Sequence, residues 1–198
     1  EQSLKPLIDT PQCRVQLSFD NKRAYFRSQL HKMKDQRYMR RTMHLSVRRS
    51  RIFEDSFHQL RMRRDEEMLQ RLSVTFHGEE GIDAGGLTRE WFTVLAREIF
   101  NPNYALFTAA NDGATFQPNP LSYVNPDHLD YFRFVGRVIG KAIVDEQLMD
   151  AHFTVSFYKH LLGLPITHHD MEAVDPEYYK NLKQILEYRL DDLGLDLT

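Results

Sequence analysis

Hydrophobic residues recur along the chain with two different periods, which predict where its strands and helices lie. Apolar and polar residues alternate over 43–47 and again over 72–76, the pattern of a strand with one buried face. Elsewhere apolar residues recur every three or four positions, as in amphipathic helices. The segments predicted to be helical are 19–33, 52–60, 88–100, 126–143, 154–162 and 177–188, with a further short helix beginning near 65.

Polar residues and proline mark where several of these helices begin. Ser50 is a suitable N-cap for the helix over 52–60, because a serine hydroxyl accepts a hydrogen bond from a free backbone N–H. Asn125-Pro126 combines a cap with a first-turn proline, and Asp175-Pro176 does the same for the last helix. These signals predict helix starts at three places.

Glycine marks a turn and a feature inside one helix. Asn111-Asp112-Gly113 is typical of a tight turn and predicts a hairpin over 105–118. Gly136 and Gly140 lie four residues apart inside the predicted helix 126–143. Since glycine costs helix propensity, this spacing predicts close packing of a neighbour against the helix.

The order of elements predicts an α+β fold that is mainly α-helical, with short hairpins. Residues 1–18 lack periodicity and are interpreted as an N-terminal arm, and residues 19–198 as one domain. The alternating segment 195–198 resembles a strand cut off from the rest of its fold. The chain shows no internal repeat and no low-complexity tract.

Composition narrows the class of protein. The chain has 198 residues, 41% hydrophobic and 27% charged, which is ordinary for a globular protein. No apolar run is long enough to span a membrane, and the first residues do not resemble a signal peptide. One cysteine, Cys13, excludes a disulfide framework and favours a reducing compartment, the cytoplasm or the nucleus.

Charge is distributed unevenly. Residues 14–71 carry 16 Lys and Arg against 7 Asp and Glu, whereas residues 72–198 are strongly acidic. A basic segment of this kind is found in nucleic-acid-binding domains. Its basic residues alternate with core-type residues, however, so the pattern favours a basic segment that lies near an acidic body.

The loop 78–86 contains four glycines and three acidic residues, and two kinds of site were considered for it. A phosphate-binding loop requires a Lys-Ser/Thr pair that is missing, and the acids would repel phosphate. A hard cation held by Glu79, Glu80 and Asp83 is disfavoured because their spacing is not that of a calcium loop. The sequence favours a structural loop with positive-φ glycines and carboxylates that accept backbone N–H bonds.

Two further candidate sites are weak. His168, His169 and Asp170 suggest a metal, but adjacent histidines are expected to point apart, and Thr167 with Asp170 forms a capping-box-like pair typical of a turn. Cys13 lies in the arm without a histidine near it, so it is not expected to be a nucleophile. No metal site, cofactor or catalytic residue is predicted from these patterns.

One stretch, Gly78–Phe92 (GEEGIDAGGLTREWF), resembles the signature of HECT-type ubiquitin ligases. The stretches that agree with the family in order and spacing are Phe53–Phe57, Phe100–Tyr104, His128–Arg137, Phe157–His160 and Asp170–Tyr179. The resemblance covers about residues 19–198 and is strongest to the very large HECT ligases of plants, fungi and animals.

The resemblance implies that the chain is the N-lobe of a HECT domain. In this family the N-lobe docks a ubiquitin-conjugating enzyme, and a C-lobe cysteine accepts ubiquitin as a thioester and passes it to substrate lysines. That cysteine lies in a His-Thr-Cys-Phe-like motif, which this sequence lacks, so Cys13 does not inherit the role. The chain is therefore expected to be a docking scaffold, truncated before the complete small subdomain and the C-lobe.

The resemblance also implies two binding surfaces. Tyr178, Asn181, Leu182 and Ile185 match family positions that contribute to the groove for the conjugating enzyme, and their spacing places them on one helix face. An apolar stripe of this kind also occurs on helices that face a core. Tyr104 matches a tyrosine that helps some HECT ligases hold ubiquitin non-covalently, although the neighbouring Asn103 departs from the aromatic residue often found there.

The partners implied are a ubiquitin-conjugating enzyme, ubiquitin and protein substrates, without a membrane or a nucleic acid. Two alternatives remain at this point. One is a nucleic-acid-binding domain that uses segment 14–71, and the other is a protein-interaction lobe without transferase activity.

Overall fold

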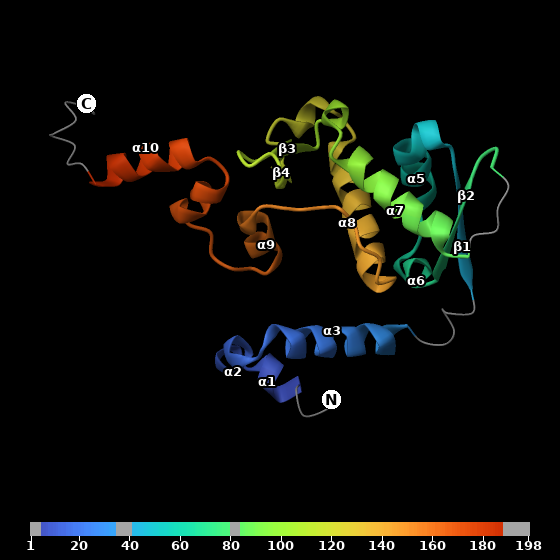
Figure 1. The fold of residues 1–198 in the computed structure, drawn as a ribbon, viewed down its shortest axis with the longest axis horizontal. Coiled ribbons are helices and arrows are strands. Elements are labelled where there is room, and N and C mark those ends of the chain that lie inside the picture. Colours follow the sequence, from blue (N-terminus) through green and yellow to red (C-terminus); the bar gives the residue numbers. More distant parts are fainter. Residues whose placement is uncertain (1–4, 35–40, 80–83, 188–198) are drawn as a thin grey trace. The chain divides into compact units, whose positions relative to one another are not determined.

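The computed structural model shows a mainly helical α+β protein, which confirms the predicted fold class (Figure 1). It describes residues 5–34, 41–79 and 84–187. No helix within these ranges is long and apolar enough to cross a membrane.

The chain divides into two units. The first takes the residues up to Phe92 together with Gly136–Leu148, and the second takes the remainder. Helices α7 (Gly86–Ile99) and α8 (His128–Val144) contribute residues to both units.

The first unit contains a pair of parallel strands, β1 (Thr42–Val47) and β2 (Arg71–Phe76), which lie side by side (Figure 1). The remaining elements of this unit are α1 Lys5–Asp9, α2 Pro11–Gln16, α3 Phe19–Met33, η1 Arg49–Arg51, α5 Ile52–Leu60 and α6 Asp65–Met68. Both strands alternate buried and outward-facing residues as predicted. They are not a hairpin, since parallel strands require a crossover, which η1, α5 and α6 provide.

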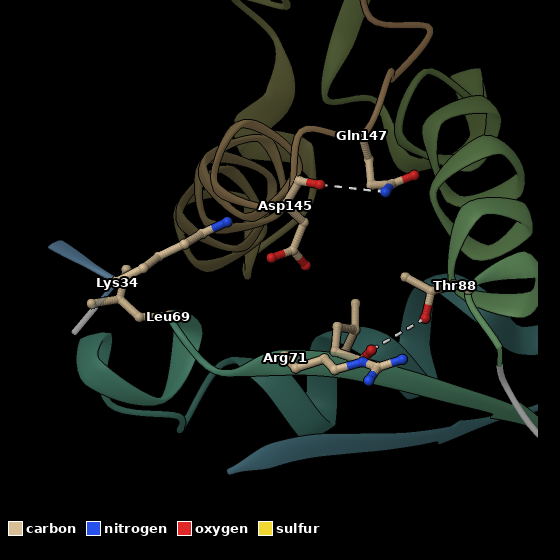
Figure 2. Close-up of a pocket in the computed structure, with 8 residues that line it drawn as sticks. Lys34, Leu69, Arg71, Thr88, Asp145 and Gln147 are labelled. Atoms are coloured by element: carbon tan, nitrogen blue, oxygen red, sulfur yellow. Dashed lines mark hydrogen bonds between the residues drawn. The ribbon is translucent and has the colours of Figure 1, made fainter. Parts of the chain in front are cut away.

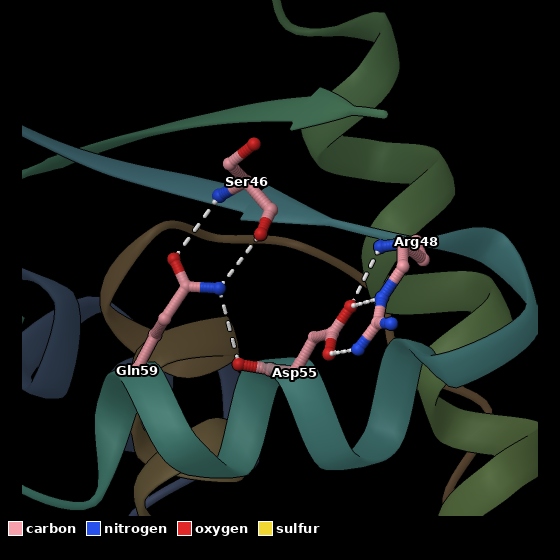
Figure 3. Close-up of polar contacts among 4 residues, drawn as sticks. All are labelled: Ser46, Arg48, Asp55 and Gln59. Carbon is pink, nitrogen blue, oxygen red and sulfur yellow. Dashed lines mark hydrogen bonds and ion pairs between the residues drawn. The ribbon is translucent and has the colours of Figure 1, made fainter. Parts of the chain in front are cut away.

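Helix α5 covers the edge of β1 that does not pair with β2 (Figure 3). The Gln59 side-chain amide accepts a hydrogen bond from the Ser46 backbone N–H at 3.1 Å and donates to the Ser46 carbonyl at 2.7 Å. One turn earlier, the Asp55 carboxylate accepts from the Arg48 backbone N–H and guanidinium. Side chains thus satisfy backbone groups that a strand edge otherwise leaves free.

The core of the first unit joins α5 and α7 to the strands. Trp91 and Ser56 are both fully buried. The indole N–H of Trp91 donates a hydrogen bond to the Ser56 hydroxyl at 2.9 Å. The buried hydrophobic residues of this unit include Leu45, Val47, Ile52, Phe53, Leu60, Val74, Phe76 and Phe92.

The second unit contains a hairpin formed by β3 (Phe107–Ala109) and β4 (Phe116–Pro118), as predicted. Its other elements are η2 Pro102–Tyr104, η3 Ser122–Val124, α9 Val155–Leu161, η4 His168–Ala173 and α10 Pro176–Glu187. Phe100 stacks on Phe116 with ring centroids 4.1 Å apart, and Phe153 and Phe107 pack edge-on to Phe100. This aromatic cluster holds the hairpin against the segment that leads into α9.

Two predicted helix starts lie elsewhere. Ser50 is not the N-cap of α5, because the chain first makes the 3₁₀ turn η1 and the helix begins at Ile52. The Asn125 side chain caps a turn by accepting a hydrogen bond from the Asp127 N–H. Helix α8 begins after this turn, at His128, and not at Pro126. In both cases an additional turn separates the capping signal from the helix.

The close packing predicted at Gly136 and Gly140 is also wrong. A Cβ added at either position would meet no other described atom within 4 Å, and both glycines are exposed. Helix α8 buries its opposite side, which carries Phe134, Val138 and Lys141.

The structure describes most of the predicted N-terminal arm but not the strand predicted at the other end. Residues interpreted as an arm form the short helices α1 and α2, and Ser18 accepts a hydrogen bond from the Asn21 N–H at the start of α3. The domain boundary at residue 19 stays a prediction. The predicted strand 195–198 lies outside the described residues.

Candidate functional site

Helix α10 begins where the sequence predicts. The Asp175 carboxylate accepts a hydrogen bond from the Tyr178 backbone N–H at 3.0 Å, and Pro176 occupies the first helical position. Glu177 lies in the first turn, where the helix dipole favours a negative charge. Local sequence is therefore sufficient to define the start of this helix.

One side of α10 is open to solvent. Tyr178, Asn181, Leu182 and Ile185, named here the α10 face, lie at helical spacing on this side; Leu182 is half-buried, and the other three are exposed. Tyr178 is 51% exposed and Ile185 54% exposed, and α10 contains no buried residue. Among the described residues, the α10 face therefore does not pack into a core.

The neighbouring side of α10 is braced by η4. The Tyr179 hydroxyl and His169 Nδ1 form a hydrogen bond of 2.8 Å, which joins the helix to the turn before it. In the same turn, Asp170 pairs with Lys159 of α9 and accepts from the Thr167 N–H. The ion pair with Lys159, followed by the Thr167 hydrogen bond, holds the pKa of Asp170 below its ordinary value. Helices α9 and α10 are thus linked through η4.

The residues considered and disfavoured as metal ligands, His168, His169 and Asp170, lie in η4, where His169 and Asp170 take part in this bracing. His168 and His169 do not point apart as expected, since their ring centroids lie 4.0 Å apart. In a 3₁₀ turn adjacent side chains are less separated than on a strand, and both rings lie beside Tyr179. Within the ranges that the structure describes, no group of three or more His, Cys, Asp or Glu is placed to hold a metal ion.

Exposed apolar side chains extend from α9 into the connection that leads to η4. They are Val155, Leu161, Leu162, Leu164 and Ile166. Leu161 and Leu162 are 69% and 72% exposed. Large apolar side chains that remain exposed in one stretch are typical of surfaces that bind another protein.

Tyr104 is the last residue of η2, and Ala105 and Leu106 connect it to β3. The Asn101 side chain caps this turn by accepting from the Asn103 N–H at 3.0 Å, and Ala105 follows with φ 54°. The Tyr104 ring packs edge-on against Tyr131 of α8, with centroids 6.4 Å apart. Tyr104 is half-buried and Asn103 exposed, so the predicted residue is partly accessible on a turn and not on a strand edge.

The glycine-rich loop is positioned by an arginine. Arg49 of η1 pairs with both Glu79 and Glu90, and its guanidinium lies over the Phe76 ring, 4.1 Å from the centroid. The hydrogen bonds from Arg49 lower the pKa of Glu79. Its carboxylate is therefore paired with a side chain, where the sequence predicted backbone N–H bonds.

The positive φ values predicted for this loop are present at Gly78 (81°) and Gly85 (109°). Its other acidic residues, Glu80 and Asp83, lie outside the described residues.

Several arginines of the basic segment form ion pairs. Arg48 pairs with Asp55, Arg49 with two glutamates, and Arg63 and Arg64 both with Glu67. Asp55 and Glu67 belong to the basic segment itself, whereas the pairs of Arg49 with Glu79 and Glu90 join the segment to the acidic part of the chain, in line with a basic segment that lies near an acidic body. Cys13 lies half-buried in α2, far along the chain from the α10 face.

A cavity of about 220 Å³ in the first unit was not anticipated from the sequence. The residues that line it include Lys34, Leu69, Arg71, Thr88, Asp145 and Gln147 (Figure 2). Burial raises the pKa of Asp145 and lowers the pKa of Lys141, which pair at 2.9 Å beside it. The lining residues come from separate segments, so no local motif marks the cavity. None of the predicted site residues lies in it.

Comparison with known proteins agrees with the family resemblance seen in the sequence. A family model described as HECT-domain (ubiquitin-transferase) matches residues 93–198. The chain is 52% identical over 198 residues to E3 ubiquitin-protein ligase UPL1 of Arabidopsis thaliana, which covers 100% of this chain and 5% of that protein.

Relatives from other kingdoms agree. Identity is 48% over 183 residues to E3 ubiquitin-protein ligase HUWE1 of Mus musculus, covering 92% of this chain and 4% of that protein. Identity is 46% over 179 residues to E3 ubiquitin-protein ligase TOM1 of Saccharomyces cerevisiae, covering 89% of this chain and 5% of that protein. The chain thus spans about one-twentieth of the length of these relatives.

Proposed function

Because the chain belongs to the HECT-domain family of ubiquitin transferases, we propose that it is the part of a ubiquitin ligase that docks the ubiquitin-conjugating enzyme. The full-length protein is proposed to accept ubiquitin as a thioester and to transfer it to lysines of substrate proteins. The large share of the chain that aligns with proteins named as E3 ubiquitin-protein ligases supports this proposal.

The exposed α10 face carries the docking proposal. Its tyrosine and its aliphatic residues are of the types that act as anchors at the centre of protein interfaces. The helix is capped at its start and braced by η4 on the side of Tyr179, so the α10 face is presented on an ordered element. A partner that binds there gains apolar burial without first displacing other described residues.

The chemistry proposed for the whole protein is a thiol exchange followed by aminolysis. A cysteine thiolate of the ligase attacks the ubiquitin thioester on the conjugating enzyme and releases that enzyme's cysteine as a thiolate. The amine of a substrate lysine then attacks the new thioester, which forms an amide, breaks the carbon–sulfur bond and releases the ligase cysteine as a thiol. The cysteine is proposed to lie outside this chain, because Cys13 does not stand in the family's motif.

Docking contributes proximity to this exchange. Two thiols react efficiently when binding holds them together, since the reaction then becomes effectively intramolecular. The cytoplasm or the nucleus is the proposed location, because a free thiolate requires a reducing environment. Imaging of the tagged protein solely in an oxidising compartment would contradict that location.

Tyr104 is proposed as a secondary contact for ubiquitin. It is partly accessible, and its ring is oriented by Tyr131. An aromatic ring held in one orientation loses little conformational entropy when it binds a partner.

The docking proposal is tested with the full-length protein and a panel of ubiquitin-charged conjugating enzymes. We expect a ubiquitin adduct on a non-reducing gel that disappears on reduction. Leu182→Ala should weaken binding of the conjugating enzyme by about 1–3 kcal/mol and slow adduct formation, because a central anchor is removed. Leu129→Ala, at an exposed leucine of α8, is the matched control and should leave binding unchanged.

Each outcome has a distinct meaning. If no conjugating enzyme of the panel gives a ubiquitin adduct, the transferase proposal is contradicted. An adduct that forms normally in Leu182→Ala, with unchanged affinity, excludes the α10 face from the interface.

A further inference from the structure

The turn of the β3–β4 hairpin is held rigidly by its own hydrogen bonds. The Gly113 N–H donates to the Ala110 carbonyl at 2.9 Å, which defines a four-residue turn, and Gly113 has φ 66°. The Asp112 carboxylate accepts from the backbone N–H groups of Thr115 and Ala114, both at 2.9 Å. These bonds, of which the one from Thr115 has the largest effect, lower the pKa of Asp112.

This turn reaches the base of α10. The Asn111 backbone N–H donates to the Val174 carbonyl at 3.0 Å. Val174 is the C-cap of η4 and directly precedes Asp175, whose carboxylate caps α10. A single backbone hydrogen bond therefore joins the hairpin turn to the residue next to the N-cap of the helix.

A second attachment lies at the start of the same segment. The Phe116 N–H donates to the His152 carbonyl at 2.8 Å, and the Thr154 N–H donates to the Phe116 carbonyl at 3.0 Å. The segment that contains α9 and η4 is thus fixed to the hairpin at both ends. The attachment at Phe116 is reinforced by the aromatic cluster around Phe100.

Among the described residues, no aromatic cluster reinforces the attachment at Val174. A cavity of about 420 Å³ lies beside it, lined by Ala109, Ala110, Asn111, Gly113, Gln117, Val174 and Asp175. Asn111 and Asp175 are exposed. The N–H groups of Val174 and Asp175 donate to the Met171 carbonyl within η4. Because little side-chain packing surrounds the Asn111–Val174 contact, that hydrogen bond carries much of the orientation of the helix base relative to the hairpin.

We propose that Asn111 is a positioning residue for docking, through its backbone N–H. By holding Val174, it keeps the start of α10 in the orientation that presents the α10 face to the conjugating enzyme. This inference rests on the proposed function. Release of the bond lowers the fraction of molecules in the docking-competent orientation, and the apparent affinity falls by the same factor.

The turn geometry permits a variant that removes this donor alone. Asn111 occupies the second position of the turn, where proline is favoured, and it is not among the residues with positive φ. Asn111→Pro therefore suits the turn but has no N–H to donate. Asn111→Ala keeps the N–H and is the matched control.

Binding of a conjugating enzyme to the full-length protein is the first measurement. Asn111→Pro should raise the dissociation constant by roughly three- to tenfold, the factor that one hydrogen bond supports. Asn111→Ala should bind as the unchanged protein does. Asp112→Ala, which loosens the turn without introducing proline, should shift affinity in the same direction as Asn111→Pro.

Hydrogen exchange without the conjugating enzyme is the second measurement. In Asn111→Pro, amides in the first turns of α10 should exchange faster, whereas those of β1 and β2 should be unchanged, which shows that the protein remains folded. Equal affinity and equal α10 exchange in the proline and alanine variants would overturn the inference and leave the proposed function intact. If the unchanged protein binds no conjugating enzyme, the proposed function fails and the inference fails with it.

Discussion

Replacement of Ser56 by alanine tests how the first unit is held together. The Ser56 hydroxyl is the described acceptor for the Trp91 indole N–H, at 2.9 Å, and both residues are 0% exposed. The substitution removes one oxygen and little volume, so the main consequence is a buried donor without a partner. Ser56 belongs to α5 and Trp91 to α7, so the bond joins two helices.

The expected magnitude follows from that burial. A buried donor left without an acceptor costs about 1–3 kcal/mol, because it loses its hydrogen bond with water as well as with the protein. For a chain of this size, such a loss lowers the melting temperature by roughly 2–12 °C. Water does not replace the hydroxyl unless the core opens, since the indole nitrogen is fully enclosed.

Urea unfolding followed by fluorescence of Trp91 measures the effect. The midpoint should fall in Ser56→Ala while the slope stays constant, which indicates a loss of stability without a change in the denatured state. Ser46→Ala, at an exposed serine of β1, is the matched control and should change stability by less than about 0.5 kcal/mol. In a Trp91→Phe background, where unfolding is followed by circular dichroism because the single tryptophan of the chain is gone, the Ser56 substitution should cost less, since the donor is absent. Equal losses in Ser56→Ala and Ser46→Ala would refute the reasoning.

Two further predictions concern charge and ubiquitin. The hydrogen bonds from Arg48 lower the pKa of Asp55 below its ordinary 3.8, so this carboxylate stabilises the fold above that pH, and the contribution disappears as the pH falls. Between pH 7 and pH 3, the free energy of unfolding measured with urea should therefore fall less in Asp55→Asn than in the unchanged protein. An equal fall in both proteins would contradict this role of Asp55. Tyr104→Ala should abolish the chemical-shift changes that free ubiquitin causes around η2, and shifts that persist in this variant would exclude Tyr104 from the contact.

Much of the fold was predictable because local patterns encode which side of an element faces the core. The alternation of Met43, Leu45 and Val47 places those three side chains on one side of a strand in any tertiary setting. The hairpin turn at Asn111–Gly113 was predictable for a similar reason, since turn geometry depends on a few adjacent residues.

Features that depend on distant residues were not predictable. Whether β1 and β2 pair in parallel depends on how α5 crosses between them, and no local pattern states this. The buried pair of Lys141 and Asp145 was missed because charged residues on a helix are normally assigned to its solvent side. Lys141 is buried because its ammonium group also donates to the Gln70 carbonyl, which is 71 residues away in the sequence.

The functional surface illustrates the same limit. Tyr178 and Tyr179 are adjacent, and periodicity predicts only that both belong to one helix. In the structure, Tyr179 bonds to His169 and braces α10, whereas Tyr178 remains half exposed on the α10 face. An amphipathic stripe has the same period whether it meets a core or a partner, so its spacing alone does not distinguish the two. The structure distinguishes a partner-binding stripe from a core stripe, because α10 is braced on one side and contains no buried residue. Substitutions on the α10 face should therefore reduce docking more than they reduce stability.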